Sequence, residues 1–224
     1  WDHTLSLFED QGVDVVGVIE SGDFVFNMKG CEFARRILCE KLGAAVVIIG
    51  ENFVFGKNRA ENVESLSHYG NMCGFRVKSI PVVCVGGARI SSTRIRRFIH
   101  SGNIEDARRC IGRNVILLGE VVKGWGAGSR LGFPTANIKP DAMIVPGEGA
   151  YAAVTTYDDK SYPSMVHVGR RPEFENNATH LNIKNYENYG AVEAHLLGFE
   201  KNILGERLRI EFHERIRQTR LFKD

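Results

Sequence analysis

Short apolar runs in the first half of the chain alternate with amphipathic segments of helical spacing. The runs that predict buried strands are Val13–Ile19, Ala44–Ile49 and Phe75–Val85. The amphipathic segments Glu32–Leu42 and Glu61–Tyr69 predict helices that end at Gly43 and Gly70, since glycine accepts the left-handed conformation that closes many helices. Strands separated by helices are typical of a parallel sheet with helices on its faces.

Two short helices are predicted after this alternation. Ser91 and Ser92 can cap a helix over Thr93–His100, because a serine side chain accepts a hydrogen bond from a free backbone N–H at a helix start. A second helix is predicted over Ile104–Ile111, and Gly112 closes it. The pair ends the α/β part of the chain.

The pattern changes after this pair, where we place the boundary between a first domain, residues 1–113, and a second, residues 114–224. Short β-type runs separated by Gly, Pro, Asn and Asp cover the second domain, with no long helical pattern between them. These runs are Val115–Val122, Ala150–Tyr157, Ser164–Val168, Ala191–Leu197 and Leu208–Phe212. Many short strands joined by turn residues predict an antiparallel barrel, which closes on itself and leaves no exposed edge.

Composition and charge narrow the functions that the chain can have. Hydrophobic residues make up 43% and charged residues 25%, which is an ordinary globular balance. The net charge is only +2 and is evenly spread, whereas a nucleic-acid binder would carry a basic face. No apolar run approaches the roughly 20 residues needed to cross a bilayer. The five cysteines form no CxxC motif or disulfide-like framework, which suits a reducing cytoplasm. We therefore expect small-molecule chemistry in the cytoplasm, with neither nucleic acid nor membrane as partner, and the oligomeric state stays open.

The segment Gly124–Asn137 has the residue types that phosphate binding needs. Its four glycines let the backbone approach a ligand and turn amides toward an anion, and Arg130 adds a positive fork for phosphate oxygens. Pro134 stiffens the backbone before Thr135 and Asn137, whose neutral oxygens are hard ligands suited to Mg²⁺. A flexible surface hairpin is the alternative interpretation. It explains the glycines but not Arg130 together with the Pro-Thr-Ala-Asn string.

The string Gly-Ser-Arg-Leu-Gly-Phe-Pro-Thr-Ala-Asn within this segment resembles the signature of riboflavin kinases, in particular of bacterial bifunctional riboflavin kinase/FMN adenylyltransferases. The resemblance implies that Thr135 and Asn137 hold a nucleotide-bound Mg²⁺, with ATP and a flavin as substrates. The residues implied in binding ATP at this site are Gly126, Gly128, Arg130, Gly132 and Pro134. The implied fold is α/β plus all-β: a partial Rossmann-like nucleotidyltransferase domain followed by an antiparallel Greek-key β-barrel of riboflavin kinase type.

The run Ala-Val-Glu-Ala-His-Leu-Leu resembles a second landmark of that family, a strand reading Glu-x-His-Leu-Leu. The resemblance implies that Glu193 is the base, which orients the ribityl hydroxyl and accepts its proton. Taken alone, Glu193 fits a solvated glutamate on the polar face of a half-buried strand. His195 shares that face, and we interpret it as structural. We expect the glycine-rich loop, with Thr135 and Asn137, to cradle a metal–nucleotide pair that faces Glu193 across a mouth of the barrel.

Two motifs of the first half extend the resemblance to the adenylyltransferase. Gly50–Gly56 resembles the loop that lines its flavin nucleotide site, and Arg89–Arg96 resembles its Ile-Ser-Ser-Thr-x-Ile-Arg signature. Hydroxyls and free amides at a helix start, together with arginines, suit a triphosphate and its leaving pyrophosphate. The alternative is a plain cap on a basic surface helix. The residues implied for this activity are Asn52, Phe53, Arg89, Ser92, Thr93 and Arg96.

Three functions remain open. The leading one is an enzyme that phosphorylates riboflavin to FMN; we expect little FMN adenylylation, because this sequence begins after the His-x-x-His-type motif of the family. Departures from the family pattern at Glu173, Gly198 and Leu204 motivate a second, a catalytically degenerate flavin- or nucleotide-binding protein. The third is an oligonucleotide-binding barrel attached to an α/β domain. It would need basic and aromatic residues interleaved on the barrel strands, and the second half lacks that pattern.

Overall fold

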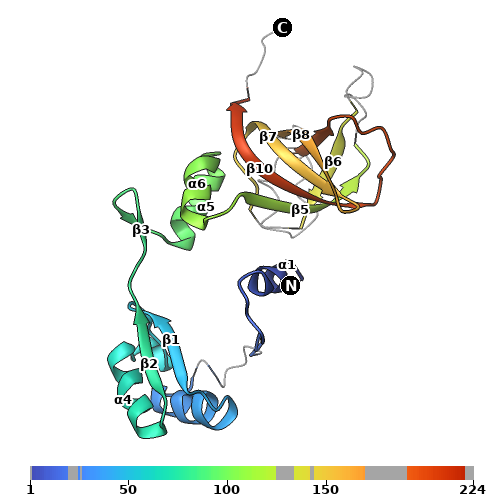
Figure 1. Ribbon diagram of the computed structural model, residues 1–224. Coiled ribbons are helices and arrows are strands. Elements are labelled where there is room, and N and C mark those ends of the chain that lie inside the picture. The colour runs from blue at the N-terminus through green and yellow to red at the C-terminus, as the bar shows by residue number, and fades with distance from the viewer. Residues whose placement is uncertain are drawn as a thin grey trace, which may run out of the picture. The chain divides into compact units, whose positions relative to one another are not determined.

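The chain forms two compact units, Trp1–Val83 and Cys84–Asp224, in the computed structural model (Figure 1). The structure describes residues 2–19, 25, 27–124, 134–141, 144–169 and 191–219. Within those residues, no helix combines the length and apolar character needed to span a bilayer. The domain boundary between residues 113 and 114 stays a prediction.

The first unit contains a two-stranded parallel sheet with helices around it. Its helical segments are α1 (Asp2–Glu9), α3 (Gly30–Phe33), the π-helix η1 (Ala34–Lys41), the 3₁₀ helix η2 (Lys57–Arg59) and α4 (Val63–Cys73). Its strands are β1 (Val46–Gly50) and β2 (Arg76–Ile80), which run parallel with Val46 opposite Arg76. The predicted parallel pairing is confirmed. It is the arrangement expected of a partial nucleotidyltransferase fold.

Three details of the first unit differ from the sequence prediction. Val13–Ile19 forms no strand, and the side chain of Val15 is 83% exposed. The helix α4 does not end at Gly70 but continues to Cys73, with Gly74 in the left-handed conformation after it. Gly70 is accommodated inside the helix because it packs against Phe75: a Cβ there would lie 2.6 Å from the Phe75 carbonyl oxygen. The helix predicted from Glu32 is helical, but its second part is wound as a π-helix.

A small apolar cluster holds the first unit together. Ala34, Phe55, Leu66 and Phe75 form its buried centre, with β1 and β2 contributing Val47, Ile49 and Val77 from one face of the sheet. The side chains that point the other way from β1 are exposed, Val46 at 44% and Ile48 at 62%. The described residues therefore cover only one face of this sheet.

The second unit begins with the hairpin β3 (Cys84–Val85) and β4 (Ala88–Arg89), followed by α5 (Ser92–His100) and α6 (Ile104–Ile111). The Ser91 hydroxyl accepts a hydrogen bond from the Arg94 N–H at 3.2 Å, which caps α5. Asn103 caps α6 in the same way. Gly112 adopts the left-handed conformation after α6, so both predicted helices are confirmed.

Six strands then close an antiparallel barrel. They are β5 (Val115–Val122), β6 (Ala136–Pro140), β7 (Gly149–Tyr157), β8 (Lys160–Gly169), β9 (Ala191–Leu196) and β10 (Arg207–Arg217). The order around the barrel is β10-β5-β6-β9-β8-β7, and β10 pairs with both β5 and β7 to close it. Since β6 lies beside β9 instead of β7, the chain crosses over in the Greek-key manner. The predicted fold class is confirmed.

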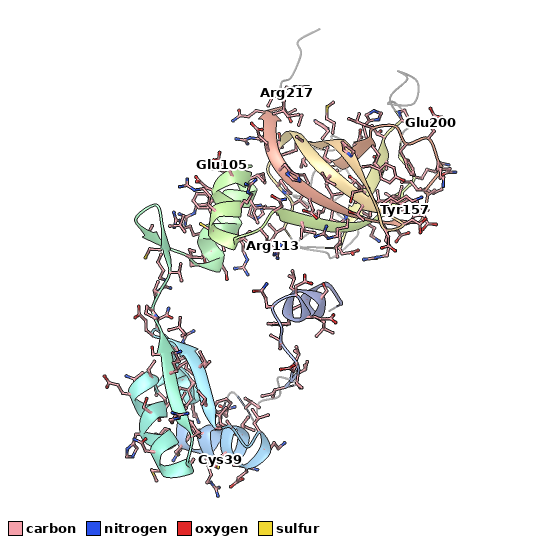
Figure 2. The ribbon with its side chains drawn as sticks, viewed as in Figure 1. Cys39, Glu105, Arg113, Tyr157, Glu200 and Arg217 are labelled. Atoms are coloured by element: carbon pink, nitrogen blue, oxygen red, sulfur yellow. The ribbon has the colours of Figure 1, made fainter. Side chains whose placement is uncertain are left out.

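The barrel interior is filled by every second residue of its strands, as the period of a β-strand requires. The largest fully buried side chains there are Tyr151, Phe212, Leu117, Ile138, Leu208, Ile210, Val166, Val192 and Thr155. Apolar residues of α5 and α6, including Ile99, Ile104 and Ala107, belong to the same core. The two helices thus pack against one end of the barrel. Tyr157, where β7 ends, stands at the other end (Figure 2).

A set of hydrogen bonds fastens the turn between α5 and α6 to the barrel. The Gly147 N–H donates to the Ile99 carbonyl at 2.9 Å, and the Arg215 guanidinium donates to the Ser101 carbonyl at 2.7 Å. The Tyr151 hydroxyl donates to the Gly147 carbonyl. Burial raises the pKa of Tyr151, although the charge of Arg215 opposes this rise, so the phenol stays a neutral donor. These bonds explain how a short helical pair becomes part of the barrel unit.

Candidate functional site

The register of the barrel brings the expected base and an expected metal ligand together. Asn137 of β6 is directly opposite Glu193 of β9, and Glu193 is directly opposite His167 of β8. Val122 of β5 continues the row beyond Asn137. Residues directly opposite each other in an antiparallel pair point to the same face, with Cβ atoms about 4.5–5.5 Å apart. The amide of Asn137 and the carboxylate of Glu193 are therefore neighbours.

This row lies on the outer face of the barrel, which corrects the expected arrangement across a mouth. In β9 the residues on either side of Glu193, Val192 and Ala194, are fully buried in the core, while Glu193 itself is half-buried. Ile138, next to Asn137, points into the same core. Because side chains alternate along a strand, Glu193 and Asn137 point outward. The two groups lie side by side on the barrel wall and do not face each other across an opening.

Asn137 is almost completely covered although it lies on this outer face, with 7% of its surface exposed. Part of the cover comes from Gly124, the last described residue before the glycine-rich loop: a Cβ at that position would collide with the Asn137 amide. No hydrogen bond joins this amide to any other residue that the structure describes. An amide oxygen that accepts no bond from these residues can bind a ligand without first breaking a protein hydrogen bond.

The chemistry of the neighbouring donors fits a magnesium ion that arrives with a nucleotide. Thr135 is half-buried and lies two residues before Asn137, just ahead of β6. A hydroxyl and an amide oxygen leave most of the coordination shell to waters and phosphates, as Mg²⁺ prefers. In the part of the chain that the structure describes, no three His, Cys, Asp or Glu side chains gather into a metal site made by protein alone.

The backbone entering β6 is tied to β9 by a histidine. His195 lies two residues after Glu193 on the same face, and its Nδ1 is 2.8 Å from the carbonyl oxygen of Pro134. Since a carbonyl only accepts, the imidazole donates from Nδ1. Of the residues implied in ATP binding, Pro134 is therefore beside the Asn137–Glu193 pair. The others, Gly126, Gly128, Arg130 and Gly132, lie outside the described residues, as does Glu173.

The six residues implied in adenylyl transfer are divided between the two units. In the first unit Asn52 is exposed, while Phe53 is half-buried and stacks on Phe55 with ring centroids 5.5 Å apart. In the second unit the side chains of the other four are exposed around the start of α5; they are Arg89, Ser92, Thr93 and Arg96.

Arg94, between these exposed residues, has a structural role. Its guanidinium donates to the Ala88 carbonyl at 2.6 Å and lies over the Phe98 ring, 5.2 Å from the centroid. It thereby links the β4 strand to α5 and supports the exposed arginines on either side. The hydroxyl of Ser91 is likewise used in capping, so the free backbone amides of this helix start are fewer than the motif alone predicts.

One residue of the barrel site, His167, was not assigned a role from the sequence, while His195 was interpreted as structural and Gly124 was grouped with the phosphate-binding glycines. A signal for both histidines was available. The alternation Val-Glu-Ala-His-Leu places Glu193 and His195 on one face, and Val-His-Val in β8 places His167 on the polar face of its strand. The contact of Gly124 with Asn137 joins the segment after β5 to β6, and no local pattern encodes it.

Known families match both units. Residues 111–224 match the riboflavin kinase family, and residues 2–94 match the FAD synthetase family. A bifunctional riboflavin kinase/FMN adenylyltransferase of Pseudomonas fluorescens is 30% identical over 213 residues, which are 95% of this chain and 65% of that protein. The protein of the same name from Escherichia coli K12 is 28% identical over 219 residues, covering 97% and 66%. The chain thus spans about two-thirds of the length of these relatives.

A solved structure has the same fold. It is a crystal structure named as a macrolide-efflux protein from Streptococcus pneumoniae, with a TM-score of 0.84 and 23% sequence identity. The match covers 100% of this chain and 68% of that one. At this identity the likeness concerns the fold alone.

Proposed function

Because this chain belongs to the riboflavin kinase family, in the form whose relatives are bifunctional riboflavin kinase/FMN adenylyltransferases, we propose that its barrel unit phosphorylates riboflavin. The γ-phosphate of ATP would pass to the terminal ribityl hydroxyl, giving FMN and ADP. The observation that supports this most directly is the pairing of Asn137 with Glu193 on one face of two neighbouring strands. Phosphoryl transfer needs such a pair: a ligand for the metal–nucleotide beside a carboxylate for the attacking hydroxyl.

Glu193 is the proposed base. A carboxylate within hydrogen-bond reach of the ribityl hydroxyl orients its oxygen toward phosphorus and accepts its proton as the new P–O bond forms. Thr135 and Asn137 would hold Mg²⁺, which, when bound, neutralises negative charge on the phosphate oxygens. Attacking and leaving oxygens lie in line with phosphorus. The nucleotide would then approach from the Asn137 side of Glu193, and the flavin from the side of His167.

Replacing Glu193→Gln tests the proposal. The amide keeps the shape of the side chain but accepts no proton, so we expect kcat for FMN formation to fall by about 10²–10⁴-fold. FMN and FAD made from riboflavin, ATP and Mg²⁺ are separated by chromatography and quantified. Glu214→Gln is the matched control, because Glu214 is exposed on β10, a strand that pairs with neither β6 nor β9. Its rate should stay within about twofold of the unchanged protein.

Two outcomes contradict the proposal. Equal rates of FMN formation in both variants would show that Glu193 is not the base. Flavin binding measured by calorimetry, with no FMN formed at any Mg²⁺ concentration, would favour the catalytically degenerate flavin- or nucleotide-binding protein. Gly198 and Leu204, which depart from the family pattern, are the residues that motivate this alternative.

We propose FMN adenylylation to FAD as a second activity of the whole protein, because residues 2–94 match the FAD synthetase family. The exposed Arg96, at the start of α5, would contact the nucleotide phosphates there. The same chromatogram tests this: FAD should be lost in Arg96→Ala while FMN formation continues. If the unchanged chain makes no FAD, the adenylylation proposal fails for this chain.

A further inference from the structure

We propose, on the basis of the kinase function proposed above, that His195 is a positioning residue for the metal-binding segment. It would hold the backbone just before Thr135 against the strand that carries Glu193. The motif Glu-x-His would then combine the base with a clamp that aligns the opposing ligands. His195 acts through Thr135 and does not itself touch a substrate.

The direction of the His195 side chain follows from burial. Its neighbours in β9, Ala194 and Leu196, are 0% and 4% exposed and point into the core. His195 therefore points outward, like Glu193 two residues earlier. On that face its Nδ1 lies 2.8 Å from the Pro134 carbonyl oxygen, a normal distance for a donated hydrogen bond.

The backbone pairing between β6 and β9 stops short of Thr135. The ladder joins Ile138 to Val192, Asn137 to Glu193 and Ala136 to Ala194, and Ala136 is the last paired residue of β6. Thr135 has no partner in that ladder. The His195–Pro134 bond holds the residue on its far side, so Thr135 lies between two tethers, one made by backbone and one by imidazole.

This arrangement predicts that loss of the imidazole weakens nucleotide binding much more than it lowers the rate constant at saturation. Without the imidazole, the peptide before Thr135 can rotate, and the threonine hydroxyl loses its alignment with the Asn137 amide. Binding of the metal–nucleotide should weaken, because residues that orient a metal ligand typically affect affinity by about 10–100-fold. Glu193 is held by the β6 and β8 ladders on both sides and keeps its position. The rate constant at saturating MgATP should change much less than KM.

The experiment compares two substitutions at one position. His195→Leu removes the donor, whereas His195→Asn keeps an N–H donor near the place of Nδ1. We expect His195→Leu to raise the Kd of MgADP, measured by calorimetry, and the KM of MgATP by about 10-fold. His195→Asn should recover most of this loss. His213→Leu, an exposed histidine of β10, is the control and should bind MgADP as the unchanged protein does.

A second measurement needs neither nucleotide nor metal. Long-range ¹H–¹⁵N spectra of the full chain distinguish the two neutral imidazole tautomers, and His195 should carry its proton on Nδ1. The Nε2–H tautomer would overturn the clamp. So would equal MgADP affinity in His195→Leu and the unchanged protein, with FMN still formed. If the unchanged protein binds MgADP, and His195→Leu weakens that binding, but no FMN forms, the clamp stands and the proposed kinase function fails.

Discussion

The two units of this chain differ in how completely the strands of their sheets are paired and covered. In the barrel, every strand has a neighbour on both sides and every inward side chain meets others, so Phe212, Ile210 and Val166 are fully buried. In the first unit, two parallel strands are covered on one face, and on the other face the side chain of Ile48 is 62% exposed. Parallel sheets are normally covered on both faces.

The difference bears on where a self-contained site can form. The barrel groups the proposed base, Glu193, with a proposed metal ligand, Asn137, on neighbouring strands of one closed sheet. The residues implied in adenylyl transfer are instead spread over both units. We therefore expect phosphorylation to depend on the integrity of the barrel alone, and adenylylation to depend on both units.

The largest effect is expected when a core side chain is truncated in one unit at a time. Phe212→Ala empties a fully buried position of the barrel and should cost about 3–5 kcal/mol, whereas Leu66→Ala in the first unit should cost about 2–5 kcal/mol. Hydrogen exchange resolved by segment should show faster exchange only in the unit that carries the substitution. FMN formation at 37 °C should fall in Phe212→Ala and persist in Leu66→Ala. The opposite pattern of activity would refute the dependence on the barrel alone.

A smaller effect is expected where the helical turn meets the barrel. Gly102 has φ of +70°, and a Cβ there would lie 2.6 Å from the Tyr151 hydroxyl and would also meet the Arg215 guanidinium. Gly102→Ala should therefore cost about 2–4 kcal/mol, from the left-handed backbone plus the displaced side chains. Gly112→Ala is the matched control. Its φ is +81° but nothing lies within 4 Å, so only the backbone cost of about 1–2 kcal/mol applies.

Urea unfolding of both variants measures the difference. If Gly102→Ala and Gly112→Ala lower the free energy of unfolding equally, the side chains of Arg215 and Tyr151 move aside at no cost, and their hydrogen bonds do not stabilise this turn. The attachment of the helices to the barrel would then rest on apolar packing alone.

The smallest predicted effect is a gain in the stability of the barrel. The Thr155 hydroxyl is fully buried in the barrel, and among the described residues it has no hydrogen-bond partner. Valine has nearly the same shape and no polar atom, so Thr155→Val should raise the free energy of unfolding by about 1 kcal/mol. Thr156→Val, half-buried on the other face of β7, should change it by less than about 0.5 kcal/mol. A loss of stability in Thr155→Val would mean that the hydroxyl has a partner.

Periodicity predicted the barrel better than the first unit, for a physical reason. Alternation over Val115–Val122 and the caps around Ile104–Ile111 are local features, and both elements have the predicted bounds. Val13–Ile19 has an equally strong apolar run but forms no strand. A strand needs a neighbour to satisfy its backbone groups, and no described strand pairs with this segment. Sequence alone states which segments can form strands, but not which find partners.

The proposed kinase site likewise depends on contacts that the sequence alone does not predict. The residues of the proposed kinase site were identified by resemblance, and the alternation of β9 contained the information that Glu193 points away from the core. The cover that Gly124 provides for Asn137, and the bond from His195 to Pro134, join segments distant in sequence. No local pattern predicts such contacts, because they depend on the register of the closed barrel.

The crossover that puts β6 beside β9 also has a consequence during synthesis. On the ribosome, Asn137 emerges well before Glu193, and β7 and β8 emerge between them. The nascent chain can therefore display no complete phosphate-handling surface until β9 has left the exit tunnel. A translation product that stops before β9 would carry the proposed metal ligands without the proposed base, and its barrel could not close.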